Sequence, residues 1–392
     1  MHKLADRLAN VTESSTLKMN SAARELAAQG KKVINLTAGE PDFKPFSAIK
    51  DATIDAIKSD FNKYTPVPGM PELRKAIAEK LNRENGLAYK PEEVCVSAGG
   101  KQTIFNFILS IVNDGDEVLI PAPYWVSYPE MVKIAGGKPV ILPTTREARF
   151  KVTPEALKAA ITKRTKAFII NSPSNPTGMM YSKSELEALA RVLEGTNVWV
   201  LSDEIYEKLV YEGQFVSFAS LSKDAFSRTI TSNGFSKSYA ITGWRAGYAA
   251  GPKNVIDAMA MIQGQSTSGI ASIVQKGALA ALAVPNSEIE KEMLSLRKRR
   301  NLMCEVLRKA EDLKFLTPDG AFYVFVDVSA YLARKPGLTT DEFALALLKN
   351  ECVGTVPGSG FGADGYLRLS FAVSEAEVRE GTERLVAALK KI

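Results

Sequence analysis

The chain has 392 residues, of which 45% are hydrophobic and 24% charged, with a formal net charge of +6. This length predicts two domains of an ordinary globular protein, and the modest, interspersed charge argues against nucleic-acid binding. His2 is the only histidine and the three cysteines lie far apart, which argues against a histidine-based triad, a metal site and disulfides. No apolar run approaches the roughly 20 residues of a membrane span and no signal peptide opens the chain, so we expect a cytoplasmic protein without a membrane partner.

The first 90 residues predict three helices, over 17–28, 48–59 and 71–84, and a short strand over 33–36. From residue 94 onward, short apolar strands alternate with helices. The strands are expected at 94–96, 117–120, 138–142, 167–170, 198–201, 228–230 and 246–250. This alternation predicts an α/β fold with a mainly parallel sheet covered on both faces, and ligands beyond the carboxyl ends of its strands.

A long, charged helix over 289–310 is expected to lead into a second, smaller domain. Its basic run, residues 297–300, predicts a solvated helix face in preference to a nucleic-acid patch. Strands at 322–326 and 366–370, a helix at 340–349 and a last helix from residue 374 form an α+β pattern.

The stretch 232–247 contains one lysine among small residues, Lys237, and an arginine eight residues further on, Arg245. Packing among small and apolar groups lowers the pKa of a lysine, which suits an amine that must be neutral to form a Schiff base. Arginine keeps its proton and suits a phosphate. An aldehyde cofactor that carries a phosphate needs both, which indicates pyridoxal 5′-phosphate (PLP), although a solvated loop has a similar composition.

Three segments that follow predicted strands offer further contacts for such a cofactor. The glycines of Gly99-Gly100-Lys101 allow backbone N–H groups to approach an anion at a helix N-terminus, or form an ordinary turn. Trp125 could stack on a planar ring or lie in the core. Asn175, in a turn-rich segment, could donate to a phenolate oxygen or form an Asx turn.

Two charged positions sit in or after apolar strands, where each needs a partner. Asp203 could hold a protonated pyridine nitrogen, which makes the ring an electron sink, or cap a following helix. Tyr206 could share the phenolate oxygen with Asn175. Arg368 could clamp a carboxylate or form an internal ion pair.

Three motifs together resemble the class I aminotransferases of PLP fold type I, most closely the bacterial aspartate aminotransferase subgroup. They are Asn175-Pro176-Thr177-Gly178, Ser202-Asp203-Glu204-Ile205-Tyr206, and Ser236-Lys237 with Thr242-Gly243-Trp244-Arg245. The resemblance extends from Leu36 to Phe371. It implies an N-terminal arm and part of the small domain at 1–45, a large PLP-binding domain at 46–288, and a small C-terminal domain at 289–392.

The resemblance also implies a role for each site residue. Lys237 forms the Schiff base, Asp203 holds the pyridine nitrogen, and Tyr206 and Asn175 hold the O3′ oxygen. Trp125 stacks on the ring. The phosphate is held by the Gly99-Gly100-Lys101 turn, Ser236, Arg245 and, across a homodimer interface, Tyr64. The substrate is held by Arg368, Trp125, Asn175, Gly39 and Lys101.

The resemblance implies transfer of an amino group from aspartate to 2-oxoglutarate, with Lys101 binding the distal carboxylate. Prephenate is an alternative acceptor, but Thr12 stands where some prephenate-using relatives carry a basic residue. Another class I aminotransferase or a PLP lyase is the nearest alternative, since PLP and Lys237 do not separate these reactions. A non-catalytic PLP-binding regulator would need a DNA-binding module, for which the helix at 17–28 is too short.

Overall fold

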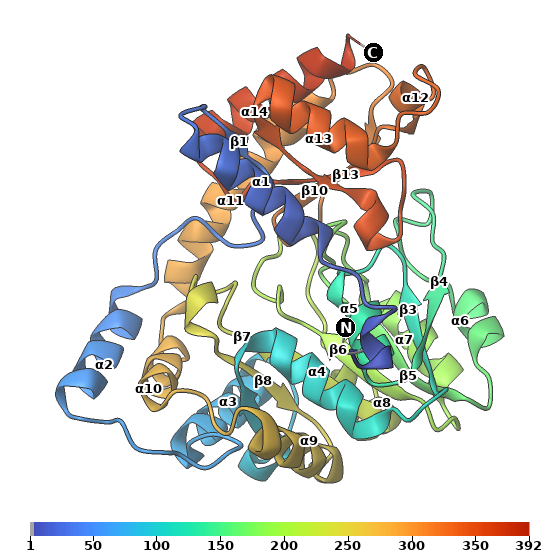
Figure 1. Cartoon of the computed structure of the whole chain (residues 1–392). Coiled ribbons are helices and arrows are strands. Elements are labelled where there is room, and N and C mark those ends of the chain that lie inside the picture. The colour runs from blue at the N-terminus through green and yellow to red at the C-terminus, as the bar shows by residue number, and fades with distance from the viewer. Residues whose placement is uncertain (1–3, 392) are drawn as a thin grey trace.

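A computed structural model describes residues 4–391, so His2 and both outer limits of the predicted domains lie outside the described residues. Its largest sheet has seven strands in the order β2-β8-β7-β6-β5-β3-β4 (Figure 1). They are β2 (Val94–Ser97), β3 (Glu117–Pro121), β4 (Lys138–Leu142), β5 (Thr165–Asn171), β6 (Trp199–Asp203), β7 (Thr229–Gly234) and β8 (Gly247–Ala250). Strand β8 runs antiparallel to both β2 and β7, and every other described pairing in this sheet is parallel. The mainly parallel sheet predicted from the alternating pattern is therefore confirmed.

Both faces of this sheet are buried by helices. Ala167 and Ile169 of β5 pack in one core with α4 (Gly99–Ile111), α5 (Ser127–Ile134) and α9 (Lys253–Ser266). Phe168 and Ile170 point to the other face, against α6 (Pro154–Ala160), α7 (Lys183–Leu193) and α8 (Lys223–Arg228). Helix α3 (Pro71–Asn85) packs against β2, α10 (Ser272–Ala281) packs against α3, and α2 (Ser47–Lys58) packs against α10. Burial on both faces explains the unbroken apolar character of the strands.

The C-terminal part forms a second region with an antiparallel sheet in the order β12-β13-β10-β9. Its strands are β9 (Lys314–Phe315), β10 (Tyr323–Asp327), β12 (Val356–Pro357) and β13 (Tyr366–Ser370). Its helices are α12 (Ser329–Leu332), α13 (Thr340–Glu351) and α14 (Glu375–Leu389). The N-terminal α1 (Ser15–Ala28) lies beside them, and β1 (Ile34–Asn35) pairs in parallel with β11 (Val353–Gly354) (Figure 1). The domain limits at 45/46 and 288/289 remain our proposal.

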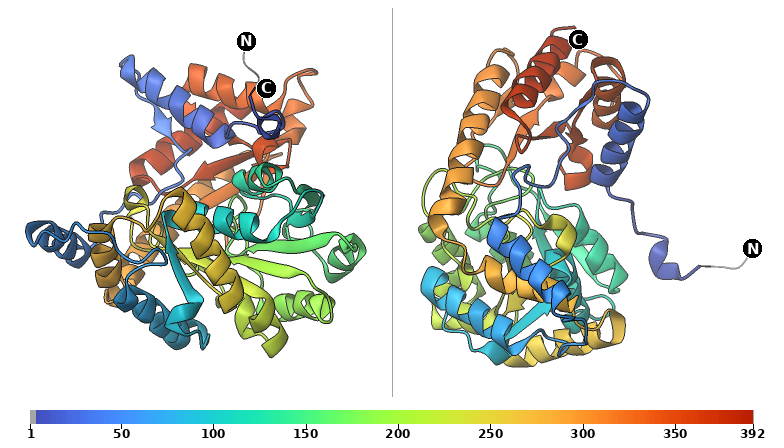
Figure 2. Two further views of the ribbon diagram at one scale, coloured as in Figure 1. Left: turned by 60° about the horizontal axis from the view of Figure 1, so that its bottom comes forward. Right: turned by 90° about the vertical axis from the view of Figure 1, so that its left-hand side faces the viewer.

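Helix α11 (Asn286–Leu307) runs along both regions (Figure 2). The prediction that its basic run is a solvated face is wrong for Arg299 and Arg300, which are 5% and 4% exposed. Arg299 pairs with Asp42 at 2.7 Å, and Arg300 pairs with Glu212 at 3.0 Å. Each guanidinium also donates to a backbone carbonyl. Arg300 thereby links Glu212 of the larger region to the Pro318 carbonyl of the smaller one, and Arg299 links Asp42 to the Val373 carbonyl, so neither guanidinium is solvated as predicted.

Short 3₁₀ helices complete the described chain: η1 (Asp6–Leu8), η2 (Pro91–Glu93), η3 (Phe218–Ser220), η4 (Thr242–Trp244) and η5 (Gly358–Phe361). Within residues 4–391, no helix is long and apolar enough to cross a membrane.

Candidate active site

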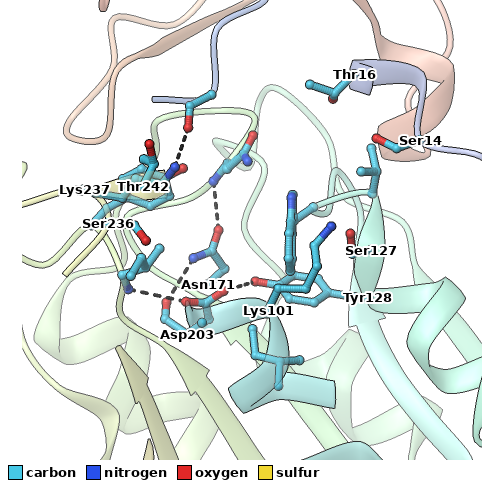
Figure 3. Close-up of a pocket in the computed structure, with 18 of the residues that line it drawn as sticks. Ser14, Thr16, Lys101, Ser127, Tyr128, Asn171, Asp203, Ser236, Lys237 and Thr242 are labelled. Atoms are coloured by element: carbon cyan, nitrogen blue, oxygen red, sulfur yellow. Dashed lines mark hydrogen bonds between the residues drawn. The ribbon is translucent and has the colours of Figure 1, made fainter. Parts of the chain in front are cut away.

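A cavity of ≈ 380 Å³ lies at the carboxyl ends of the parallel strands, where the strand pattern predicted a ligand (Figure 3). Eleven of the thirteen predicted site residues line it. They are Gly39, Gly100, Lys101, Trp125, Asn175, Asp203, Tyr206, Ser236, Lys237, Arg245 and Arg368. Gly99 lies just behind this wall, against the Arg245 side chain. Tyr64 is not part of the cavity and is 99% exposed.

Lys237 follows β7 and extends into the cavity, where its Nζ donates a hydrogen bond to the carbonyl of Gly39 (Figure 3). Burial lowers the pKa of Lys237 from 10.5 to about 8; Glu40 opposes this shift, and the nearby Arg368 and Arg245 reinforce it. A substantial fraction of the side chain is therefore a neutral amine near pH 8. A neutral, buried amine can act as a nucleophile toward a carbonyl and as a proton acceptor.

Asp203 ends β6 and is 6% exposed. Its Oδ2 accepts a hydrogen bond from Tyr128 Oη at 2.5 Å, and its Oδ1 accepts one from the backbone of Ile205 at 3.3 Å. Burial raises the pKa of Asp203 to about 6, against the effect of these hydrogen bonds and of Lys237. After Asp203, the next described helix begins only at Phe218. Asp203 therefore does not cap a helix, and that alternative is wrong. A buried carboxylate facing a cavity can bind a cationic nitrogen.

Arg368 lies in β13 and is 1% exposed. It donates to Asn175 Oδ1 at 3.0 Å and to the Thr37 carbonyl at 2.8 Å, while its Nε has no hydrogen-bond partner among the described residues. Its guanidinium lies over the rings of Tyr323 and Phe361, at 4.4 and 5.1 Å from their centroids. Among the described acidic side chains none forms an ion pair with it, so the alternative of an internal ion pair is wrong. Within residues 4–391 this buried cation therefore has no anionic partner, and a ligand carboxylate would supply one.

The N-terminus of α4 and Arg245 form the anion-binding side of the cavity. Arg245 donates to the carbonyls of Thr242 and Ala98, at 2.8 and 3.3 Å, which fixes its guanidinium beside the first turn of α4. Gly99 has a φ of +81°, and a Cβ there would lie 2.5 Å from Arg245 Nη2. The positive φ favours glycine here, and a Cβ would displace the Arg245 guanidinium; backbone N–H groups, helix dipole and guanidinium together suit a phosphate.

Lys101 places another cation at the cavity wall. Its Nζ lies 5.1 Å from the centroid of the Trp125 ring, and burial, together with Arg245, lowers its pKa. None of the described ion pairs includes this lysine. A cation in the first turn of a helix opposes the helix dipole, so an anionic partner would stabilise it.

Several cavity residues were missed by sequence reasoning. Asn171 ends β5, donates to the Asp203 carbonyl at 2.9 Å and accepts from the Asn175 backbone at 2.8 Å. Its position at the end of a predicted parallel strand could have indicated that Asn171 belongs to the site. Tyr206 and Tyr323 share a hydrogen bond of 3.0 Å between their hydroxyls. Tyr323 comes from the other region of the chain, and nothing local in its sequence indicates this contact.

The N-terminal segment forms another part of the wall that was not predicted, through Ser14, Thr16 and Leu17. It is tied to α5 by Thr12, whose backbone N and Oγ1 donate to the two carboxylate oxygens of Glu130 at 2.9 and 3.0 Å. Sequence alone does not place a terminal segment over a cavity formed mainly by residues 100–245.

These features agree with comparisons to known proteins. The family model for aminotransferase class I and II matches residues 31–385. The chain belongs to this family, whose class I members, such as aspartate aminotransferase, use PLP. The site fits that cofactor and an amino-acid substrate. Lys237 is a partly neutral amine, the turn at Gly99 with Arg245 suits a phosphate, and the buried Arg368 guanidinium suits a carboxylate.

Individual relatives are similar over nearly their full length. The aspartate/prephenate aminotransferase of Cereibacter sphaeroides is 47% identical over 391 residues, covering 98% of each chain. The aspartate aminotransferase of Bacillus subtilis is 44% identical over 99% of each chain. Among solved structures, the aspartate aminotransferase from Rhizobium meliloti superposes with a TM-score of 0.95 at 42% identity, covering 100% of this chain and 99% of that chain. The aspartate aminotransferase from Thermus thermophilus with maleate superposes with a TM-score of 0.93 at 45% identity, covering 99% of this chain and 100% of that chain.

Proposed function

We propose that this aminotransferase moves the amino group of L-aspartate to 2-oxoglutarate, giving oxaloacetate and L-glutamate. Four cations line the cavity and form none of the described ion pairs; with Arg245 assigned to the phosphate and Lys237 to the cofactor aldehyde, the observation that carries this proposal is that Arg368 and Lys101 remain for carboxylates. A dicarboxylic substrate supplies one carboxylate to each. The relatives named above, all aspartate aminotransferases or aspartate/prephenate aminotransferases, support the same substrate class.

The cofactor contacts are assigned as follows. Asp203 holds the pyridine nitrogen, and Asn175 and Tyr206 hold the O3′ oxygen. The Trp125 indole packs against the ring face. The amides of Gly100 and Lys101 bind the phosphate together with Ser236 and Arg245, which Gly99 allows to approach.

PLP, when bound, supplies an aldehyde that accepts the amino group and a ring that takes up negative charge from the substrate α-carbon. The chain's own groups then do three things. Arg368, with Asn175 and the Gly39 backbone, holds the α-carboxylate. Asp203 keeps a proton on the ring nitrogen. Lys237 Nζ takes the proton from the substrate α-carbon and returns it to the cofactor's aldehyde carbon, acting first as base and then as acid.

Lys101→Ala tests the substrate assignment. One charge-assisted contact is worth about 1.5–3 kcal/mol, so kcat/KM for aspartate should fall roughly ten- to a hundredfold. Activity toward alanine or an aromatic amino acid should change much less, because these substrates have no distal carboxylate. Steady-state kinetics with the three amino donors measures the difference. An equal loss for all donors would assign Lys101 to the cofactor phosphate and remove the main support for aspartate.

Prephenate is the second candidate acceptor, favoured by the name of the Cereibacter sphaeroides relative. Thr12 is neutral, and its polar atoms already bind Glu130. We therefore place prephenate below 2-oxoglutarate. Comparing the two acceptors at fixed aspartate concentration would decide between them.

We further propose that the active unit is a cytoplasmic homodimer in which Tyr64 reaches the partner's phosphate site. In the single chain the Tyr64 ring is 99% exposed, so it is available to contact a partner subunit. Mixing inactive Tyr64 and Lys237 variants under conditions of subunit exchange should restore part of the activity, because a hybrid dimer can hold one intact site. The separate variants, mixed with themselves, are the control. A fully active monomer in sedimentation experiments would contradict the proposal.

A further inference from the structure

Tyr128 contacts two of the groups assigned to the cofactor ring. It lies at the start of α5, is 2% exposed, and points its hydroxyl toward Asp203 (Figure 3). The Oη–Oδ2 distance of 2.5 Å is in the range of an O–H donor bound to an ionised carboxylate. The edge of the same tyrosine meets the Trp125 ring, with centroids 5.3 Å apart and planes at 81°.

We propose that Tyr128 is a positioning residue that keeps Asp203 ionised and aimed at the pyridine nitrogen, and fixes Trp125 against the face of the same ring. This inference rests on the proposed function, because it needs the cofactor in the cavity. Neither the sequence motifs nor the family resemblance singled out this residue.

The hydrogen-bond count around Asp203 leaves room for this arrangement. An ionised carboxylate offers about four lone-pair sites. Tyr128 occupies one on Oδ2 and the Ile205 backbone occupies one on Oδ1 at 3.3 Å, a long contact. Both oxygens therefore keep capacity for a second donor, such as a protonated ring nitrogen.

The electrostatic surroundings of Asp203 make the Tyr128 hydroxyl important. Burial is the main effect on the pKa of Asp203 and raises it, so the carboxylate depends on local donors to stay ionised. The titratable groups that face it are Tyr128 from α5, Lys237 from the loop after β7 and Tyr206 from the loop after β6. Tyr128 donates to it directly. Without that donor, a buried carboxylate takes up a proton more readily and loses its hold on a cationic nitrogen.

A comparison within the chain shows that a buried tyrosine does not need a carboxylate. Tyr211 is also 2% exposed, and its hydroxyl donates to the neutral Ala321 carbonyl at 2.6 Å. Tyr211→Phe is therefore the matched control for Tyr128→Phe. Both variants lose one buried hydroxyl and keep the aromatic ring, but only Tyr128→Phe loses a donor to Asp203.

The test uses the full-length enzyme loaded with PLP that carries ¹⁵N in the ring. In the wild type and in Tyr211→Phe, the ¹⁵N chemical shift near neutral pH should report a protonated ring nitrogen. In Tyr128→Phe it should move toward the unprotonated value, and the equilibrium dissociation constant for PLP should rise roughly tenfold or more. Tyr128→His, which keeps an N–H donor, should recover part of both effects.

The possible results separate this inference from the proposed function. A wild-type protein that does not bind PLP would overturn the proposed function itself. A PLP-loaded, active wild type with an unchanged ¹⁵N shift and affinity in Tyr128→Phe would overturn only the role of Tyr128. Equal changes in Tyr211→Phe, no recovery in Tyr128→His, or failure of both Tyr128 variants to fold would assign Tyr128 to core packing and also overturn it.

Discussion

Lys237→Ala is expected to abolish multiple turnover while the protein still folds and holds PLP non-covalently. The reason is that one amine serves as nucleophile and as proton carrier at the substrate α-carbon. Positioned proton transfer alone contributes roughly 10²–10⁴-fold to a rate, so the loss of both roles should exceed about 10³-fold. Borohydride treatment of the wild type should fix the cofactor covalently, and mass spectrometry of peptides should place it on Lys237.

Lys151→Ala is a suitable control for this experiment. Lys151 is a largely buried lysine with 11% side-chain exposure, pairs with Glu185, and lies outside the cavity that contains Lys237. Its replacement should leave turnover close to that of the wild type. Near-normal turnover of Lys237→Ala, or borohydride labelling of another lysine, would contradict the role of Lys237 as nucleophile and proton carrier.

Arg368→Met is expected to lower kcat/KM for aspartate by roughly 10²–10⁴-fold, because it removes a two-pronged, charge-assisted contact with the α-carboxylate. Unlike Lys101→Ala, it should affect dicarboxylic and neutral amino donors alike. The melting temperature of the PLP-free protein should stay the same or rise. Burying a cation without an anion costs free energy, and removing it offsets the loss of the hydrogen bonds to Asn175 and Thr37.

The control for Arg368 is Arg299→Met. Both arginines are buried, at 1% and 5% exposure, but Arg299 pairs with Asp42 and donates to the Val373 carbonyl. Its replacement should lower the melting temperature, since it breaks an existing ion pair. A strong destabilisation by Arg368→Met with unchanged kcat/KM would show that Arg368 is structural.

The fold could be predicted largely from local pattern. Strands buried on both faces, such as β5 and β6, must be continuously apolar, and this distinguishes them from the helices between them. Pairing between distant segments could not be predicted in the same way. Strand β1 has two residues, and its partner β11 lies more than 300 positions away, so nothing in residues 33–36 indicates where it binds.

In the candidate site, too, local sequence pattern predicted some residues, whereas others depend on contacts between distant segments. Asp203, Asn175 and Lys237 follow strand ends, so the rule for parallel sheets brought them to one edge. Arg368 was predicted as an anion-binding residue because a charge in an apolar strand needs a partner. Tyr128 and Tyr323 were missed because an aromatic side chain in a core pattern is usually only packing, and their hydroxyl contacts depend on the tertiary structure. The burial of Arg299 and Arg300 was missed for the same reason, since helical periodicity does not reveal a second covering region.

The most direct test of the central claim is a half-reaction. PLP-loaded enzyme is mixed with excess L-aspartate in the absence of any oxo acid, and oxaloacetate, ammonia and the cofactor are quantified after the absorption change is complete. We predict one oxaloacetate per bound cofactor, recovery of the cofactor as pyridoxamine 5′-phosphate, and no ammonia, as a ping-pong transfer requires. Continuous release of ammonia with unchanged PLP would indicate a lyase and contradict the account, as would the absence of any reaction with aspartate.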